Sequence, residues 1–356
     1  MQIYMQAFDN SIKGRESAYM MGKWLQAQLL GDVRAVEWCQ ARGINVNPQN
    51  ALTAGNNALG GVLVPEEWSS TIIRLVETYG VFRRNTRVVP MSTDSMHIPR
   101  RTGGLTAYYV GENTAGTESD MSWDDVQLSV KKLMILTRMS SEINDDALIV
   151  LADMLAQEMA YAFALKEDTV GFTGTGASTD GGITGILVKC IDGSHGKAKV
   201  AAASGHDTLA EIDSTDLINL MAAIPLYAKP SSAWYCSPTA EELIFNAIKV
   251  SGGGNTGSIL AARQSPGFLG YPINVTPIMA DDSTATYNGD VVVAFGNLSL
   301  ASTLGSRRDV RIQLSTEQYW EEDQIGVKGT MRHDINIHDV GSDAVRSPFA
   351  VLTGQS

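Results

Sequence analysis

Residues 60–101 read GGVLVPEEWSSTIIRLVETYGVFRRNTRVVPMSTDSMHIPRR and place three differently built segments in quick succession. An extended arm comes first. A helix then opens at Pro65 or just after it, where Glu66 and Glu67 suit the positive end of the first turn, and it stops near Gly80. The first strand of a long hairpin begins at about Val88. We expect this order of arm, helix and strand to decide how the rest of the chain folds.

The hairpin that follows is long and has no cover of its own. The chain breaks at residues 102–104, resumes over residues 105–110 and passes through a polar stretch at residues 111–125. The return strand, residues 126–136, begins by alternating Val126, Leu128 and Val130 with polar side chains. A two-stranded ribbon is at best marginally stable in water, so we expect another copy of the same protein to cover this arm.

The middle of the chain predicts a long helix and then an α+β domain. Leucine, methionine and phenylalanine recur every three or four residues from Leu148 to Phe163, after a cap at Ser140 or Ser141, and the helix ends near Gly171. A glycine-rich loop, residues 171–187, leads into a short strand. Helices are expected at residues 214–224 and 238–250, the second with Ser237 as N-cap and Pro238 at its first position. Strands are expected at residues 233–237, 273–277 and 291–295. Strands at residues 310–314 and 332–340 are expected to return to residues 86–99, which makes the outer domain discontinuous.

The N-terminal segment is amphipathic. Apolar side chains at Met21, Leu25 and Leu29 continue to Val33 and Val36 and draw one helical stripe, which residues 31–32 split. Two interpretations stay open: a local helical hairpin, or a segment that docks on a neighbouring subunit with Trp24 and Trp38 as anchors. Residues 45–61 have no periodicity and predict an extended connector.

The composition limits the function. The chain has 356 residues, enough for about two domains, and its 27 Lys and Arg against 39 Asp and Glu leave a net charge of −12, which argues against nucleic-acid binding through the net field. Cys39, Cys190 and Cys236 are far apart without CxxC spacing and indicate reduced intracellular thiols. No apolar run reaches the roughly 20 residues of a membrane helix, and no signal peptide is recognisable, so we expect a cytoplasmic protein.

No motif indicates a nucleotide site or a hydrolase. Gly174, Gly176 and Thr179 break the GxGxxG spacing, and the loop follows a helix instead of a strand. Gly196 and Lys197 are followed by Ala198, which leaves no hydroxyl for magnesium. GxSxG and HExxH are absent.

The histidines do not predict a metal site. His333 and His338 fall on opposite faces of an expected strand, and His195 and His206 lie in a polar loop without carboxylate or thiol spacing. We therefore expect no catalytic residue, no cofactor and no metal.

Two charged groups are candidates for contacts between subunits. Asp120, Asp124 and Asp125 surround Trp123 near the arm tip, where they form a cation site, a solvated acidic loop, or partners for Arg or Lys of a neighbour. The densest basic set borders the arm and reads either as ordinary surface charge or as inter-subunit ion pairs, which we favour; it comprises Arg83, Arg84, Arg87, Arg100 and Arg101.

Several separated motifs, in order, resemble the major capsid proteins of tailed bacteriophages with the Hong Kong 97-like fold. They are GGVLVPEE from Gly60, YGVFR from Tyr79, IPR from Ile98, AYYVGE from Ala107, GITGIL from Gly182 and PFAVL from Pro348. The resemblance covers roughly residues 53–352, most of the chain.

The resemblance implies an α+β fold in six parts. These are an N-terminal amphipathic helical extension (1–50), an N-arm with a short helix (51–90), an extended loop formed by a strand hairpin (91–140), a spine helix with the first part of a peripheral domain (141–184), an axial domain (185–304) and the second part of the peripheral domain (305–356).

It also implies function and partners. Subunits of this family form pentamers and hexamers of an icosahedral shell around double-stranded DNA, assembled in the host cytoplasm, with scaffolding, portal and decoration proteins as further possible partners. No lysine lies between Arg101 and Lys131, so we expect a shell without the lysine–asparagine crosslink of some members. We expect residues 1–50 to stay on the shell. The alternatives are an encapsulin-type nanocompartment and a soluble α+β hydrolase or binding module.

Overall fold

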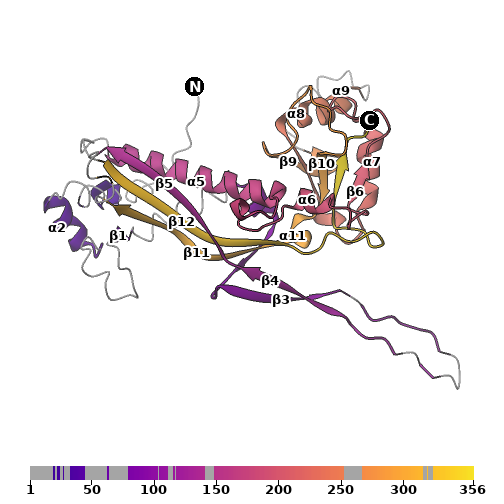
Figure 1. The fold of residues 1–356 in the computed structure, drawn as a ribbon, viewed down its shortest axis with the longest axis horizontal. Helices are drawn as coiled ribbons and strands as arrows, with labels where there is room; N and C mark the ends of the chain where they lie inside the picture. Colours follow the sequence, from indigo (N-terminus) through magenta and orange to yellow (C-terminus); the bar gives the residue numbers. More distant parts are fainter. Residues whose placement is uncertain are drawn as a thin grey trace.

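A computed structural model describes residues 19–20, 22–24, 27, 33–44, 62–63, 79–102, 104–110, 115–116, 118–140, 148–251, 267–315, 319 and 324–356. Within these residues the chain forms two sheets and a protruding two-stranded ribbon (Figure 1). The fold is therefore of the mixed α+β kind that the sequence predicts.

The first sheet is long and is covered by the longest helix. In the described residues it runs in the order β1 (Val62–Leu63), β11 (Ser302–Ser315), β12 (Gln324–Ile337) and β5 (Lys131–Ser140), and β2 (Arg87–Pro90) pairs with β11 in parallel. Helix α5 (Leu148–Thr173) lies along this sheet (Figure 1). The early segment thus pairs with a late strand, but through residues 303–306 of β11, which precede the predicted strand at residues 310–314.

The second sheet carries the expected α+β elements. Its order is β6 (Lys199–Ala201), β13 (Phe349–Thr353), β10 (Val291–Gly296), β7 (Ala233–Cys236), β9 (Tyr271–Val275) and β8 (Gly267–Phe268). Helices α7 (Ser214–Ala223), α8 (Pro238–Ala240) and α9 (Ala247–Ser251) lie around it, with a π-helical segment (Glu241–Asn246) between the last two. Ser237 caps α8 as predicted, because its Oγ accepts the Ala240 N–H at 3.1 Å.

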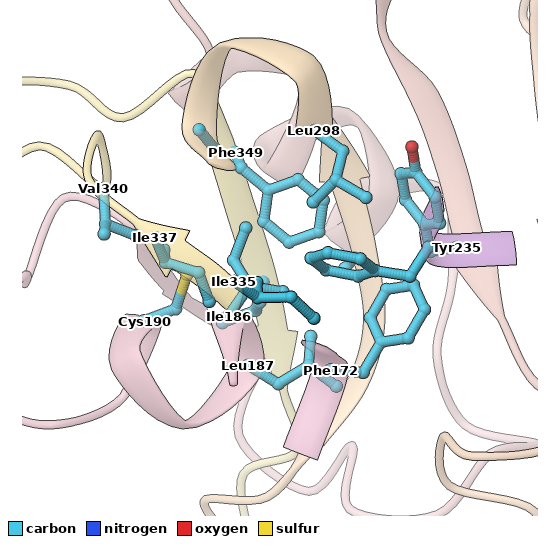
Figure 2. Packing of buried hydrophobic residues seen from close by; sticks show 14 of the residues in the cluster. Phe172, Ile186, Leu187, Cys190, Tyr235, Leu298, Ile335, Ile337, Val340 and Phe349 are labelled. Atoms are coloured by element: carbon cyan, nitrogen blue, oxygen red, sulfur yellow. The ribbon is translucent and has the colours of Figure 1, made fainter. Parts of the chain in front are cut away.

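One apolar cluster joins the two sheets. Figure 2 shows Phe172 at the end of α5, Tyr235 of β7 and Phe349 of β13 packed beside Ile335 and Ile337 of β12. Helices α6 (Ile186–Cys190) and α11 (Leu298–Ala301) complete it. Because both sheets contribute to one core, the second sheet packs on the first.

The C-terminal strand β13 (Phe349–Thr353) lies in the second sheet and not, as expected, in the outer domain with the first sheet. Residues 305–356 were assigned to the outer domain, but β13 pairs with β10 and β6. All five residues of β13, FAVLT, are buried. An apolar strand without alternation needs cover on both faces, which the interior of the second sheet provides.

The hairpin is shorter than predicted on its return side. Strand β3 (Ser95–Arg101) pairs with β4 (Trp123–Ser129), and the chain then leaves the ribbon after Val130, where β5 joins β12. The expected return strand, residues 126–136, is therefore two strands in different sheets. Its alternation is confirmed at Val126 and Leu128, which are buried against the body.

The glycine-rich loop ends in a helix instead of a strand, because residues 186–190 form α6. The loop is a tight reversal in which the Gly185 N–H donates to the Gly174 carbonyl at 2.7 Å. A Cβ on Gly185 would lie 2.4 Å from the Phe172 carbonyl oxygen, so only glycine fits there. The reversal brings α6 back onto the end of α5.

The described N-terminal residues pack on their own chain. Helix α2 (Val33–Ala41) contributes Ala35 and Cys39 to a cluster with Phe163 of α5, and Trp24 is fully buried in the same cluster. The Trp38 ring lies edge-on to Tyr19 with 5.5 Å between centroids. This favours the local interpretation of the segment. Ser140, one of the two predicted caps of the long helix, is the last residue of β5. The other predicted cap, Ser141, the connector at residues 45–61 and the predicted helix over residues 65–78 lie outside the described residues.

Candidate assembly surfaces

The ribbon continues beyond β3 and β4 as a bare arm. The described residues between 102 and 122, here called the distal arm, extend away from both sheets (Figure 1). The Thr102 N–H donates to the Ser122 carbonyl at 2.9 Å, and the Thr106 N–H donates to Ser119 Oγ at 3.1 Å. The described residues between 104 and 122 form no strand. Both edges of the distal arm therefore offer backbone groups for pairing.

Large apolar side chains crowd the distal arm and its base. Tyr109 is fully exposed and Leu105 is 66% exposed, and the others are Tyr108, Val110, Met121 and Trp123. Moving apolar side chains out of water lowers the free energy of the system. A single exposed apolar side chain is ordinary, whereas a run of them marks an interaction site. We therefore treat the distal arm as the first candidate assembly surface.

The predicted acidic cluster divides into two kinds of carboxylate. Asp125 binds His97 across the ribbon, and Asp124 lies 3.8 Å from Arg100. Asp120 and Glu118 are exposed on the distal arm. Among the described residues, these aspartates do not come together as a set of metal ligands. Asp120 and Glu118 therefore leave negative charge exposed to solvent on the distal arm. Trp123, at the base of the arm, is 59% exposed.

Arg83 is not available to a neighbouring subunit. It lies in α4 (Val81–Asn85), where its Nε and Nη2 donate to the two carboxylate oxygens of Glu167 on α5, each at 2.8 Å. Arg83 is 5% exposed and Glu167 is 1% exposed. The expectation of an inter-subunit ion pair is wrong for Arg83, because a two-point ion pair inside its own chain occupies the guanidinium. Trp24 is likewise buried within its own chain and is not available as an anchor on a neighbouring subunit.

Asp168, the next residue on α5, caps α4. Its carboxylate accepts the N–H groups of Val81 and Phe82, each at 2.9 Å, where Gly80 has no side chain to act as a cap. Burial raises the pKa of Asp168 to about 6, against the opposing effect of the two N–H bonds. Glu167 and Asp168 together fix α4, and with it the start of β2, on the long helix.

The other arginines lie on or near the surface. Arg84 donates to Asn274 at 3.4 Å, and Arg87 is exposed on β2. Arg100 is 27% exposed; it donates to the His338 carbonyl and lies 3.6 Å from Asp339. Arg101 pairs with Trp123 in the ribbon. Arg100 therefore binds the ribbon to its own body, whereas Arg84 and Arg87 remain candidates for contacts with another copy.

A basic sheet face was missed by the sequence reasoning. Leu133 and Ile135 of β5 point toward α5, so Lys132, Met134, Leu136 and Arg138 face the other way. The same face continues across register partners on β12 and β11 as Lys328, Thr330, Arg332, Arg311 and Gln313. The named positions carry no acidic side chain. The signal was present in KKLMILTR from Lys131, which alternates charged or long side chains with the core positions.

This basic face also exposes apolar surface. Met134 is 51% exposed and Leu136 is 50% exposed, directly beside Thr330 and Lys328. Arg332 lies 3.6 Å from Asp94, whereas Lys132 and Lys328 have no ion pair within the described part of the chain. The basic face thus combines positive charge with two apolar side chains and is the second candidate assembly surface.

Two histidines were misjudged, because the fold brings carboxylates to them. His195 Nδ1 lies 2.9 Å from Asp192, and His206 Nδ1 lies 2.6 Å from Asp216. The hydrogen bond to Asp216 raises the pKa of His206. With Asp213, His206 and Asp216 form a metal-like trio, but both carboxylates accept backbone N–H groups in the capping box of α7. The trio therefore serves as a helix cap.

The remaining titratable groups are structural. His333 is buried, and desolvation lowers its pKa, while burial followed by Arg100, Lys189 and Arg87 lowers the pKa of His338 to about 4. All three cysteines are free and buried. No helix in the described residues combines the length and apolarity needed to cross a membrane.

Comparisons with known proteins place this arrangement among shell proteins. The model of the phage capsid family matches residues 60–344. The major capsid protein of Klebsiella oxytoca phage phiKO2 is 28% identical over 236 residues, which are 65% of this chain and 53% of that protein. The chain thus spans about half the length of this curated relative.

Solved structures share the fold. The capsid of a native GTA particle matches with a TM-score of 0.57 and 17% identity over 86% of this chain and 96% of its own. A chain of Mycobacterium phage Bobi matches with a TM-score of 0.56 and 16% identity, covering 78% of this chain and 91% of its own. At such low identity the likeness concerns the fold, and the sequence match concerns the family.

Proposed function

Because the chain belongs to the phage capsid family, we propose that it is the major capsid protein of a tailed double-stranded DNA bacteriophage or prophage. Its copies assemble into pentamers and hexamers of an icosahedral shell that encloses the genome. The role is structural and not enzymatic. The proposal includes the Hong Kong 97-like subdivision into arm, extended loop, spine helix, peripheral domain and axial domain. We assign β13 to the axial domain, because it pairs with β10.

The distal arm is the observation that carries the proposal. Its apolar side chains are exposed, and its backbone is unpaired over most of the described length. A lone subunit would leave this surface in water at a cost of about 25 cal/mol for each Å² of apolar area. Burial against another copy removes that cost and explains why a chain would keep such an arm.

The basic face of a second copy is complementary to the distal arm in charge and also exposes apolar side chains. The distal arm contains acidic and apolar side chains and neither lysine nor arginine. The basic face combines Lys132 and Lys328 with Met134 and Leu136. Opposite charge steers two patches together, and apolar contact supplies most of the affinity. We propose that the distal arm of one copy lies on the basic face of the next.

The acidic balance of the chain suits a container for DNA. With a net charge of −12, the chain as a whole repels phosphate, so the enclosed DNA is held without sequence-specific binding. Scaffolding, portal and decoration proteins are the further partners that a shell of this kind would need. Since no lysine lies between residues 101 and 131, we propose that the shell carries no lysine–asparagine crosslink from the arm.

The alternatives are less well supported. The family model and the curated relative do not favour an encapsulin-type compartment. A soluble hydrolase or binding module would have to leave the distal arm uncovered. Neither alternative accounts for the arm and the family match together.

Negative-stain electron microscopy of the purified chain, with light scattering on the same sample, tests the proposal. We expect uniform hollow shells, or free pentamers and hexamers. A stable monomer that stays monomeric when candidate scaffolds from the same genome are added would contradict it. A covalent ladder of multimers on a denaturing gel would contradict the proposal of a shell without crosslinks.

A further inference from the structure

A row of polar contacts fixes the base of the ribbon to the outer face of the first sheet. The Ser129 N–H donates to Asp334 Oδ2 at 2.6 Å, and Asn336 Nδ2 donates to the Gln127 carbonyl at 2.7 Å. Arg100, opposite Asp124 on the ribbon, donates to the His338 carbonyl. We call these three contacts the arm-base ladder.

The ladder follows the two-residue repeat of a strand. Asp334, Asn336 and His338 occupy alternate positions, and their partners Ser129 and Gln127 alternate in the opposite direction on β4. Alternate residues of a strand face the same side, about 6–7 Å apart, so the contacts hold the ribbon along a line instead of at a point. A ribbon held along a line cannot swing about one pivot.

Apolar packing anchors the same part of the ribbon. Leu128 is fully buried and Val126 is 5% exposed, and both lie on the side of the ribbon that faces the body. Leu128 and Met91 pack on Gly305 of β11, where a Cβ would lie 2.4 Å from Met91 Sδ and 3.1 Å from Leu128. Apolar contact holds the ribbon down without giving it a direction, whereas hydrogen bonds are directional.

The described residues of the distal arm make no comparable contact with the body. From Thr102 onward the described residues are exposed and largely without cross-strand pairing. The direction in which the distal arm leaves the body is therefore set at the ladder. Figure 1 shows the ribbon below the right-hand part of the long strands and the distal arm running outward from it.

We propose that Asp334, Asn336 and Arg100 are positioning residues that set the direction of the arm and thereby the angle at which the next copy is bound. The inference rests on the proposed assembly and names a determinant of its geometry. In a closed shell, the angle between neighbours decides the curvature. An arm with a fixed exit direction yields one shell size, and an arm with a loosened base yields a spread of sizes or open sheets.

Two measurements on the full chain test the proposal. Hydrogen exchange is followed over residues 122–131 in the unassembled protein, and particle diameters are measured by electron microscopy after assembly. The variants are Asn336→Ala alone and Asp334→Ala with Asn336→Ala. Asn288→Ala, which also removes one asparagine side-chain hydrogen bond but lies in neither the ladder nor the basic face, is the matched control.

We expect exchange over residues 122–131 to rise about thirtyfold in the double variant and about fivefold in Asn336→Ala, which corresponds to about one kcal/mol for each lost hydrogen bond. Particles of the two variants should spread in diameter, and those of Asn288→Ala should not. Unchanged exchange in both ladder variants, or faster exchange with wild-type diameters, overturns the proposal. If the wild-type chain forms no shells, the proposed function fails, and exchange alone still decides whether the ladder holds the arm.

Discussion

Arg83 of α4 and Glu167 of α5 form a two-point ion pair whose N–O distances are both 2.8 Å and whose side chains are almost completely buried. The residues are 84 positions apart in sequence, and the pair fastens the segment that leads into β2 to the long helix. A buried ion pair of this kind is weak as a source of net stability, but each partner depends strongly on the other.

Loss of one partner should therefore be costly. We expect Glu167→Gln to lower the free energy of unfolding by about 3–5 kcal/mol, because the Arg83 guanidinium is left buried without a counter-charge. Urea unfolding at one fixed protein concentration measures this. Arg84→Gln, on the exposed side of α4, is the control and should stay within about 0.5 kcal/mol of wild type. A Glu167→Gln variant as stable as the control would contradict the pairing.

The stability of the chain should depend on pH through Asp168. Because burial raises its pKa to about 6 from the ordinary 3.8, the folded chain holds this proton more tightly than the unfolded chain does. The stabilisation is fully present below about pH 4 and is lost as the pH rises through about 6, by up to about 3 kcal/mol. Asp168→Asn cannot titrate, so wild type should lose stability relative to this variant over that window.

Urea unfolding at a series of pH values checks this dependence. Glu158→Gln, on the exposed face of the same helix, supplies the background for removing a carboxylate from α5. A difference between wild type and Asp168→Asn that is constant from about pH 4 to pH 7 would contradict the assignment.

Gly185 should not tolerate a side chain. An added Cβ would meet the Phe172 carbonyl at 2.4 Å and the Gly174 nitrogen at 2.5 Å, and both are backbone atoms that cannot rotate away. We expect Gly185→Ala to lower the free energy of unfolding by about 1–3 kcal/mol or more. Gly116→Ala on the distal arm, where nothing lies within 4 Å, is the control and should leave unfolding unchanged. Equal stability of the two variants would show that the reversal before α6 is looser than described.

The apolar side chains of the distal arm should govern assembly and not folding. We expect Tyr108→Ser with Tyr109→Ser to raise the protein concentration needed for half-assembly by at least about tenfold, since burial of one large side chain is worth about 1.5–3 kcal/mol. Light scattering measures assembly, and urea unfolding should match wild type. Val345→Ser removes an exposed apolar side chain away from the arm and is the control. Normal assembly of the double tyrosine variant would exclude the distal arm as the contact.

The proposed contact between arm and sheet can be tested by exchanging charges. Glu118→Lys with Asp120→Lys should impair assembly, because it brings positive charge to the basic face. Lys132→Glu with Lys328→Glu, combined with these changes, should restore assembly in part. The double-mutant cycle over four proteins isolates the coupling. Effects that simply add would show that the distal arm and the basic face do not meet.

The periodic spacing of apolar residues in the sequence was enough to predict several helices and strands. The alternation at Val126 and Leu128 predicted a half-buried strand, and the helical stripe from Leu148 to Phe163 predicted the long helix. Ser237 followed by Pro238 predicted a helix start. Such signals depend on the residue types within a few positions and on the repeat of the backbone, so one chain segment carries them alone.

The sites were less predictable. Arg83 was expected to pair with another subunit, because only the fold brings Glu167 beside it. The basic face was overlooked, because its members come from three strands that are neighbours only in the sheet. His206 looked isolated for the same reason, although Asp216 is only 10 residues away.

By itself, the sequence determined the family, the helix and strand types of most described elements, and the existence of an arm that needs a cover. Only the tertiary structure decided that β13 lies between β6 and β10 in the second sheet, that the return strand divides after Val130, and which charges are already paired inside the chain. Secondary structure follows from local backbone preferences and the spacing of apolar residues. Strand partners and ion pairs join distant segments, and burial in a shared core selects them.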